Sequence, residues 1–205
     1  MKLKVYMEGG GDPRELKSRC REGFSEFLRK AGLENRMPRI VAGGSRQQTF
    51  GQFCTALGKA RTDEFTGLLV DSEAAVPPGT GPWAHLDERD GWVRPKPATD
   101  DNAQLMVQCM EAWFLADRDG LAGFFGNGFN RKVLPARADV ENIAKSDLFA
   151  ALRQATRRCT TKGEYGKGRH SFGILGRIDP GRVMAASPHA ERLVETLMRQ
   201  AGVRP

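Results

Sequence analysis

Three acidic residues follow apolar stretches of the chain at spacings that suit a metal site. Residues 2–7 alternate polar and apolar side chains, as in a strand with one buried face, and end at Glu8. A nearly continuous apolar stretch at residues 65–70, typical of a parallel strand covered on both faces, ends at Asp71, and Glu73 follows. Open α/β sheets bind ligands outside the carboxyl ends of their strands. The sequence therefore predicts that Glu8, Asp71 and Glu73 bind Mg²⁺ together, with Mn²⁺ as a substitute.

Each of these acids also has an ordinary structural interpretation. Acids directly after strands often cap the next helix or lie in a loop. Asp71 and Glu73 are two positions apart, however, and in extended backbone their side chains leave the chain on the same side, so that both can reach one cation. Two acidic strand ends in this order favour the metal site.

A fourth carboxylate, Glu111, follows a predicted fourth strand that ends at Met110. It is expected to begin a helix over residues 111–117, where a glutamate stabilises the helix dipole without any catalytic purpose. The alternative is that Glu111 completes the metal shell with Glu8 and Asp71, directly or through water. The sequence leaves both interpretations open.

Positive charge is concentrated in one part of the chain. Residues 151–182 carry eight basic and two acidic side chains, a net charge of +6 out of the formal +7 of the whole chain. A cationic segment beside an acidic metal site is what a phosphodiester ligand needs, because lysines and arginines can hold the phosphates that flank the metal. The alternatives are a solvated helix face and a face that docks an acidic partner.

Four side chains are predicted to contact the substrate. The glycine-rich loop at residues 160–170 exposes backbone and clusters Lys167, Arg169 and His170. We expect Lys167 to stabilise the charge that develops on a transferred phosphoryl group, and Arg169 and His170 to bind the substrate. Arg46, in the first turn of a helix that begins just beyond a strand, is expected to touch a phosphate at the same edge. The alternative for Arg46 is a solvated surface arginine.

The composition excludes several classes of protein. The chain has 205 residues and a mean hydropathy of -0.49, which describe a soluble protein large enough to bury a core. Its four cysteines form no Cys-x-x-Cys pair and its three histidines are scattered, so neither a zinc site nor a disulfide framework is indicated. No apolar stretch is long enough to span a bilayer and no signal-peptide core is present, so the expected location is cytoplasmic, without a membrane partner.

The apolar patterns predict alternating strands and helices. After the first strand we expect a helix over residues 13–31, capped by Asp12. A second strand at residues 39–42 precedes a helix over residues 45–60 that opens with a capping box, and the third strand follows. The order β-α-β-α-β predicts an α/β fold with a Rossmann-like, doubly wound, mainly parallel sheet.

The chain is expected to divide into a core and an extension. Residues 1–120 form the α/β core, and residues 121–205 form a basic, mainly helical extension packed on it. Within the core, residues 74–101 are rich in proline and glycine and are interpreted as a loop excursion, which either acts as a lid or packs as an irregular insertion through its two tryptophans. Further helices are predicted at residues 84–89, 146–158 (capped by Ser146 and Asp147), 168–177 and 188–201.

The order of the acids resembles a known domain. A hydrophobic strand that ends in Glu8-Gly9, Asp12 shortly after it, and a later strand that ends in Asp71-x-Glu73 are similar to the pattern of the TOPRIM domain. This domain occurs in topoisomerases, primases and the nucleases linked to overcoming-lysogenization (OLD-type) ATPases. The second acid of the pair is Glu73 where the TOPRIM pattern has an aspartate, and its side chain is one methylene longer.

Two later segments extend the resemblance over nearly the whole chain. Residues 110–117 and 165–170 are similar to those of a family of small TOPRIM-like bacterial proteins, the domain family DUF4276. The resemblance implies a TOPRIM-like core with a metal shell to which Glu111 belongs. It also implies a subunit that works with a partner ATPase in phage defence or in the restriction of foreign DNA.

These observations predict a Mg²⁺-dependent nuclease that hydrolyses phosphodiester bonds in nucleic acid, with DNA favoured over RNA. Asp71 and Glu73 are expected to position the metal. Glu8 binds it or serves as general base, and Lys167 supports the phosphate. One alternative is a non-catalytic binding or regulatory subunit of an ATPase complex, and another is nucleotidyl transfer as in primases. The oligomeric state stays open.

Overall fold

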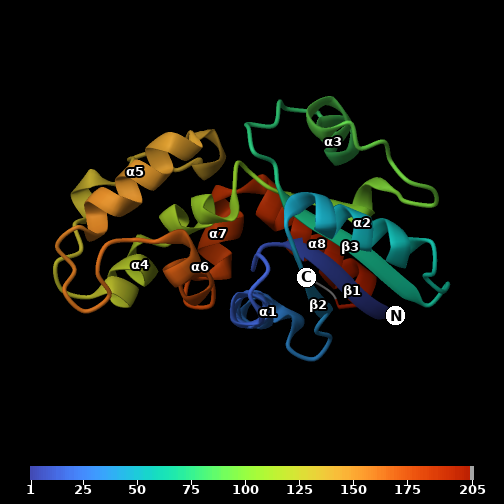
Figure 1. Ribbon diagram of the computed structural model, residues 1–205, viewed down its shortest axis with the longest axis horizontal. Helices are drawn as coiled ribbons and strands as arrows, with labels where there is room; N and C mark the ends of the chain where they lie inside the picture. The colour runs from blue at the N-terminus through green and yellow to red at the C-terminus, as the bar shows by residue number, and fades with distance from the viewer. Residues whose placement is uncertain (204–205) are drawn as a thin grey trace.

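The computed structural model describes residues 1–203 and contains a four-stranded, all-parallel β-sheet (Figure 1). The predicted α/β class is confirmed, and the sheet is entirely parallel where a mainly parallel one was expected. Its strands lie in the order β2-β1-β3-β4. They are β1 (Lys2–Glu8), β2 (Arg39–Gly44), β3 (Glu64–Asp71) and β4 (Ala103–Met106).

The first two crossovers run in opposite directions along the sheet. From β1 the chain passes through α1 (Arg14–Leu28) to the edge strand β2, and then through α2 (Arg46–Leu57) back past β1 to β3. Because βαβ connections are right-handed, this reversal places α1 and α2 on opposite faces. The strand order reverses between β1 and β3, which is the position where open α/β sheets bind ligands.

Each face of the sheet has its own hydrophobic core. One face packs against α1 and α8 (Pro188–Ala201), with Phe27 and Leu197 buried there. The other face packs against α2 and α3 (Pro82–Asp90), with Phe53 buried there. The alternation of side chains along the strands supplies apolar groups to both faces, which fixes the register of β1 between its two neighbours.

The remaining helices form a second lobe beside the carboxyl ends of the strands (Figure 1). The last helix, α8, leaves this lobe and returns to the sheet, so residues 121–203 both build the lobe and complete the α/β layer. The helices of the lobe are α4 (Arg118–Phe125), α5 (Lys145–Thr156), α6 (Lys167–Leu175) and α7 (Pro180–Ala186). Short 3-10 helices lie at Asp100–Asn102, Met110–Ala116, Arg131–Val133 and Val140–Asn142.

The ends of the predicted amino-terminal helices were only partly correct. Helix α1 has no side-chain cap, and Pro13 takes its N-cap position, so the predicted Asp12 cap is wrong. The helix ends at Leu28, earlier than predicted, and a π-helical turn leads on to Gly32, whose φ of 99° cannot continue a right-handed helix. The capping box at Ser45 is confirmed, with its side chain accepting from the Gln48 backbone.

Larger differences occur in the second half of the chain. The predicted α-helix over residues 111–117 is a 3-10 helix, Met110–Ala116, and β4 ends at Met106 before it. Helix α5 starts at Lys145 without a side-chain cap, so the predicted Ser146 cap is wrong. Helices α4 and α7 were not predicted, because α4 carries two interior glycines and α7 is short, which weakens the local helix signal.

The excursion at residues 74–101 is a packed insertion. Trp83 is buried and its Nε1 donates a hydrogen bond to the Thr99 carbonyl at 2.8 Å. Trp92 is also buried and stacks on Phe50 of α2, with ring centroids 4.1 Å apart. These contacts bear out the packed alternative, because both tryptophans hold the excursion against α2.

The structure also describes the four cysteine thiols and the length and polarity of each helix. All four cysteines have free thiols, and burial raises the pKa of each. Within residues 1–203, every helix is too short or too polar to cross a membrane.

Candidate metal centre

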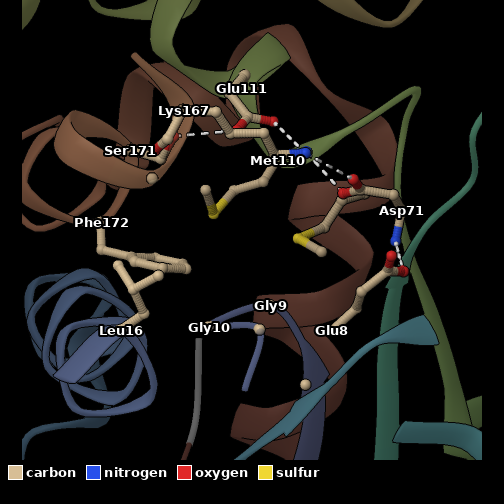
Figure 2. Close-up of a pocket in the computed structure, with 14 residues that line it drawn as sticks. Glu8, Gly9, Gly10, Leu16, Asp71, Met110, Glu111, Lys167, Ser171 and Phe172 are labelled. Atoms are coloured by element: carbon tan, nitrogen blue, oxygen red, sulfur yellow. Dashed lines mark hydrogen bonds and ion pairs between the residues drawn. The ribbon is translucent and has the colours of Figure 1, made fainter. Parts of the chain in front are cut away.

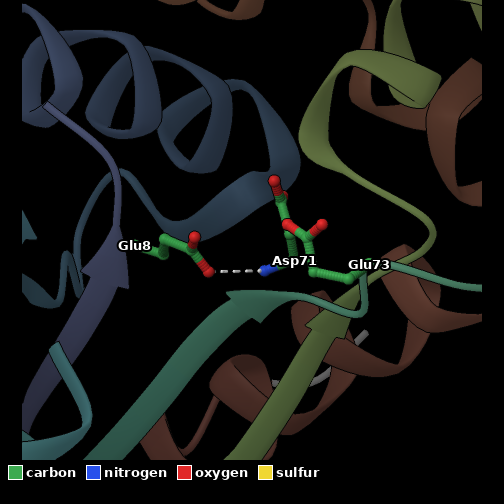
Figure 3. A group of neighbouring side chains, drawn as sticks. All are labelled: Glu8, Asp71 and Glu73. Carbon is green, nitrogen blue, oxygen red and sulfur yellow. Dashed lines mark hydrogen bonds between the residues drawn. The ribbon is translucent and has the colours of Figure 1, made fainter. Parts of the chain in front are cut away.

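Glu8 and Asp71 end neighbouring parallel strands and lie against each other (Figure 3). Strands β1 and β3 pair with Met7 opposite Leu69, so their carboxyl ends are adjacent. The backbone N–H of Asp71 donates a hydrogen bond to Glu8 Oε2 at 3.2 Å. The prediction that these two acids meet, although 63 positions separate them in the chain, is confirmed.

Glu73 joins the two acids through a turn. Its φ is 67°, in the left-handed region, so the prediction of extended backbone at Glu73 is wrong. The side chain still reaches the site: Glu8, Asp71 and Glu73 each offer a carboxylate oxygen, and these oxygens lie within 4.8 Å of one another (Figure 3). Three carboxylates at this spacing can bind one divalent cation.

Two basic side chains already hold Glu73. Lys145 Nζ lies 2.7 Å from Glu73 Oε2, and a guanidinium nitrogen of Arg89 lies 3.9 Å from the same oxygen. Burial would raise the pKa of Glu73, but the hydrogen bond and charge of Lys145 and the charge of Arg89 outweigh it and lower that pKa. A cation that binds Glu73 must therefore compete with these two side chains.

Glu111 lies on the other side of Asp71 and is fully buried. Its Oε1 accepts hydrogen bonds from Ser171 Oγ at 3.0 Å and from Tyr165 OH at 3.4 Å. Its Oε2 has no hydrogen-bond partner among the residues that the structure describes. A buried carboxylate oxygen without a partner is costly, so this oxygen is suited to meet a cation or a ligand.

The sequence did not indicate that Tyr165 and Ser171 lie at the site. Tyr165 OH lies 2.8 Å from Ser171 Oγ, and the two hydroxyls together hold one oxygen of Glu111. The Tyr165 ring stacks on Phe149, and its hydroxyl serves this hydrogen-bond network. No local pattern marks a buried hydroxyl whose partner lies more than fifty positions away.

Lys167 forms ion pairs with the carboxylates of both buried acids. Its Nζ lies 3.9 Å from Asp71 Oδ2 and 3.7 Å from Glu111 Oε2. Burial would lower the pKa of Lys167, but the charges of Glu111 and Asp71 outweigh it and raise that pKa, so the side chain stays an ammonium. Lys167 is the first residue of α6 and its side chain is about half-exposed, which leaves it free to move toward an incoming phosphate.

Crowding of carboxylates changes how Asp71 and Glu8 titrate. Burial, together with the nearby charges of Glu111 and Glu8, raises the pKa of Asp71 to about 7. Burial also raises the pKa of Glu8, although the charge of Arg46 opposes it. Carboxylates that repel each other in this way gain from a bound divalent cation, which removes the repulsion and displaces the protons.

A pocket of about 230 Å³ opens between the two lobes at these acids (Figure 2). Three carboxylates, of Glu8, Asp71 and Glu111, line it together with the ammonium group of Lys167. The opposite end is lined by apolar side chains and by glycines. The charged groups that can do chemistry thus line one pocket of small-molecule size.

Arg46 points at the site, but its guanidinium is already engaged. It donates to Glu8 Oε2 at 3.1 Å and to both carboxylate oxygens of Asp90, at 3.0 and 2.6 Å, and it also donates to the Asp71 carbonyl. These bonds orient Glu8 toward Asp71. The structure thus gives Arg46 a role in positioning the acids; a phosphate contact, as predicted, would have to displace one of these partners.

The other two predicted substrate contacts differ in exposure. Arg169 is exposed and its carbonyl accepts a hydrogen bond from Arg19 of α1, but among the described residues its side chain is not one of those that line the pocket. His170 is buried: Gly166 N donates to its Nδ1 at 3.0 Å, and its Nε2 lies 3.2 Å from the Lys162 carbonyl. These bonds fix the loop that carries Lys167, so a direct substrate contact by His170, as predicted, would have to displace one of them.

The donor set fits a hard divalent cation. The three clustered ligands are all carboxylates, which Mg²⁺ and Mn²⁺ favour, whereas zinc would favour histidine or cysteine. Oε2 of Glu111, which accepts no hydrogen bond within residues 1–203, lines the same pocket as Asp71 and provides a further negative group that a hydrated cation can contact through water. Glu8, Asp71 and Glu73 are thus the residues that would hold the ion, with Glu111 at its border.

Comparison with known proteins gives one family and no individual relative. The model of a family described as "Domain of unknown function (DUF4276)" matches residues 7–198, which include every acid of the site. Neither the curated proteins nor the solved structures contain a match to the chain. The geometry of the site therefore has to carry the functional argument.

Proposed function

The chain belongs to the family described as Domain of unknown function (DUF4276), and we propose that it is a Mg²⁺-dependent nuclease that hydrolyses phosphodiester bonds. One observation carries the proposal: the carboxylates of Glu8, Asp71 and Glu73 approach within 4.8 Å at the point where the strand order reverses, beside a pocket that also holds Lys167. A clustered acid site with an ammonium group at its mouth suits an anionic substrate held by a cation.

Each residue then has a defined task. Asp71 and Glu73 position the ion, which when bound polarises a phosphoryl oxygen and lowers the pKa of a water molecule. Glu8, with its raised pKa, accepts a proton from the attacking water or helps to hold the ion. Lys167 turns from Asp71 and Glu111 toward the negative charge that develops on the phosphoryl group.

The wider setting is part of the proposal. The strand-end acids resemble those of TOPRIM domains, and we propose on that likeness that the sheet is a TOPRIM-like core and that DNA is the substrate. By the same likeness, the chain would be the TOPRIM subunit of a system with a partner ATPase, acting in phage defence or in the restriction of foreign DNA. The basic side chains of the helical lobe, such as the exposed Arg157, Arg158 and Arg169, support binding of a polyanion.

A cleavage assay with matched variants tests the function. The wild type is incubated with single- and double-stranded DNA in Mg²⁺, in Mn²⁺ and in a chelator, and is compared with Glu8→Gln and Asp71→Asn. Cleavage that needs the metal and falls more than about a hundredfold in both variants supports the proposal, because loss of outer-shell groups alone costs about 10–100-fold. Cleavage that both variants retain would identify a contaminant.

One observation favours a second candidate, a non-catalytic regulatory subunit. Lys145, Arg89 and Arg46 already neutralise Glu73 and Glu8, so the acids are partly satisfied without any cation. Under this alternative the acidic cluster is a structural ion-pair network. It predicts that the chain cuts no nucleic acid in either metal, alone or with an ATPase, and that Mg²⁺ leaves its thermal stability unchanged.

A further inference from the structure

The pocket has two chemically different ends. The acids and Lys167 line one end, while Leu16 of α1, Met110 and Phe172 of α6 face each other at the other end (Figure 2). Met106, which pairs with Asp71 between β3 and β4, adds an apolar group at the charged end, and Gly9 and Gly10 lie between the two ends (Figure 2). Mg²⁺ and phosphate account for the charged end only, so the apolar end needs a ligand group of its own.

The size of the pocket limits that group. Sites for drug-sized ligands hold roughly 300–1,000 Å³, and this pocket holds about 230 Å³. One flat ring system fits such a space, whereas a peptide, a lipid chain or a base pair does not. A ring that enters it meets the aromatic ring of Phe172 and the flexible thioether of Met110, both of which pack well against flat apolar groups.

Gly9 allows Phe172 to pack closely against the backbone of the pocket wall. Gly9 has a φ of 133°, a conformation that L side chains rarely adopt, and a Cβ at this position would lie 3.3 Å from Phe172 Cζ. The absence of a side chain lets Phe172 lie directly against the backbone that follows Glu8. The apolar end of the pocket therefore adjoins the backbone next to Glu8.

We propose that the apolar end of this pocket binds a nucleobase, and that the nucleotide at the active site is therefore unpaired. The proposal rests on the proposed function for the position of the phosphate, which the cation and Lys167 would hold at the charged end. The sugar would then span the glycine wall, and the base would lie against Phe172, Leu16 and Met110. Because a paired base carries its partner with it, only a single-stranded end, a flap or a flipped nucleotide can enter.

A small ligand without a phosphodiester bond tests this binding apart from cleavage. The full chain in Mg²⁺ is titrated calorimetrically with 2′-deoxyadenosine 5′-monophosphate and with 2-deoxyribose 5-phosphate, which lacks the base. Stacking of one base on an aromatic side chain corresponds to about five- to a hundredfold in affinity. We expect the nucleotide to bind tighter than the sugar phosphate by a factor in this range.

Two variants with a matched control assign the effect to the pocket. Phe172→Leu keeps an apolar side chain but removes the ring, and we expect it to lose most of the advantage of the nucleotide. Leu16→Trp, at a half-buried position, narrows the pocket and should have the same effect if Phe172→Leu does not fold. The control is Phe50→Leu, because Phe50 is a half-buried, stacked aromatic residue on the other face of the sheet.

The outcomes separate the two proposals. Equal affinity for nucleotide and sugar phosphate, or no binding of the nucleotide, overturns the base pocket even if DNA is cut. An advantage for the nucleotide that Phe172→Leu and Leu16→Trp leave intact also overturns it, because the base then binds elsewhere. An advantage that both variants remove and Phe50→Leu keeps supports the pocket, and if the wild type cuts no DNA, the nuclease proposal alone fails.

Discussion

The carboxylates of Glu73 and Glu111, on the two sides of Asp71, have opposite electrostatic surroundings. On the outer side, Glu73 is half-exposed and paired with Lys145 and Arg89, and its pKa is lowered. On the inner side, Glu111 is fully buried, one of its oxygens has no hydrogen-bond partner within residues 1–203, and Lys167 approaches it at 3.7 Å. The fold pairs the outer acid with two basic side chains, whereas within the described residues Oε2 of the inner acid accepts no hydrogen bond and has the Lys167 ammonium group at ion-pair distance.

This difference bears on what a bound cation costs. An ion at Glu73 must displace or share two basic side chains, which reduces its net binding energy. A cation near Glu111, or a water molecule bound to that cation, would contact Oε2, a buried oxygen that accepts no hydrogen bond within residues 1–203. Asp71 belongs to both sides. Substitution of Asp71 should therefore have a larger effect than substitution of Glu111 or of Lys145, the partner of Glu73.

A large effect is expected from Mg²⁺ on stability, through Asp71. A ligand at a hundred times its Kd stabilises the folded state by about 2.7 kcal/mol, which for a chain of this size raises Tm by roughly 5–10 °C. Asp71→Asn should abolish this rise. Glu64→Gln, which changes an acid at the opposite end of β3, should keep it. A thermal melt with and without Mg²⁺ measures both, and an unchanged Tm in the wild type would support the regulatory alternative.

The inner acid should matter more for catalysis than for binding of the ion. Glu111→Gln leaves the three clustered ligands in place, so Mg²⁺ should still raise Tm, while the rate of DNA cleavage should fall about 10–100-fold, the range typical of groups around a metal shell. The rate at saturating Mg²⁺ measures this effect. Loss of both properties together would make Glu111 a direct ligand and would remove the distinction between the two sides.

The metal-free chain should lose stability as pH rises, because of Asp71. Its pKa is raised from 3.8 to about 7 in the folded chain, so the folded state keeps a proton that the unfolded chain releases above about pH 4. The stabilisation is therefore complete below pH 4 and is lost as pH rises through 7, on the order of 4 kcal/mol in all. Urea unfolding at pH 5 and pH 8 in a chelator measures the loss, and Asp71→Asn should reduce it. An equal loss in the variant would assign it to other groups.

The smallest effect is expected on the outer side. Lys145→Met removes a competitor of the cation at Glu73, so Mg²⁺ should bind about threefold tighter, which is within the range of about 0–1 kcal/mol for partly exposed ion pairs. Calorimetric titration with Mg²⁺ measures the change. Arg61→Met, which breaks an exposed ion pair with Asp63 far from the site, is the control. Weaker binding in Lys145→Met would show that Lys145 orients Glu73 and does not compete for it.

Local sequence patterns were enough to find the residues at the centre of the site. The alternation up to Glu8 and the apolar stretch before Asp71 predicted two parallel strands, and the acids at their ends lie together because such strands end at one edge. The same reasoning failed for the backbone at Glu73, where a left-handed turn, and no extended strand, brings the side chain to the cluster. Turn conformation depends on contacts that period-two patterns do not contain.

The sequence by itself thus determined the class of fold and the two acidic strand ends, because each depends on neighbours along the chain. The tertiary structure decided which charges are compensated: it paired Arg46 with Glu8 and Asp90, buried His170, and held Glu111 with Tyr165 and Ser171. The physical reason is that the partners of Arg46 and Glu111 come from segments 38 to 60 positions away along the chain, and only the packing of the folded chain brings these segments together.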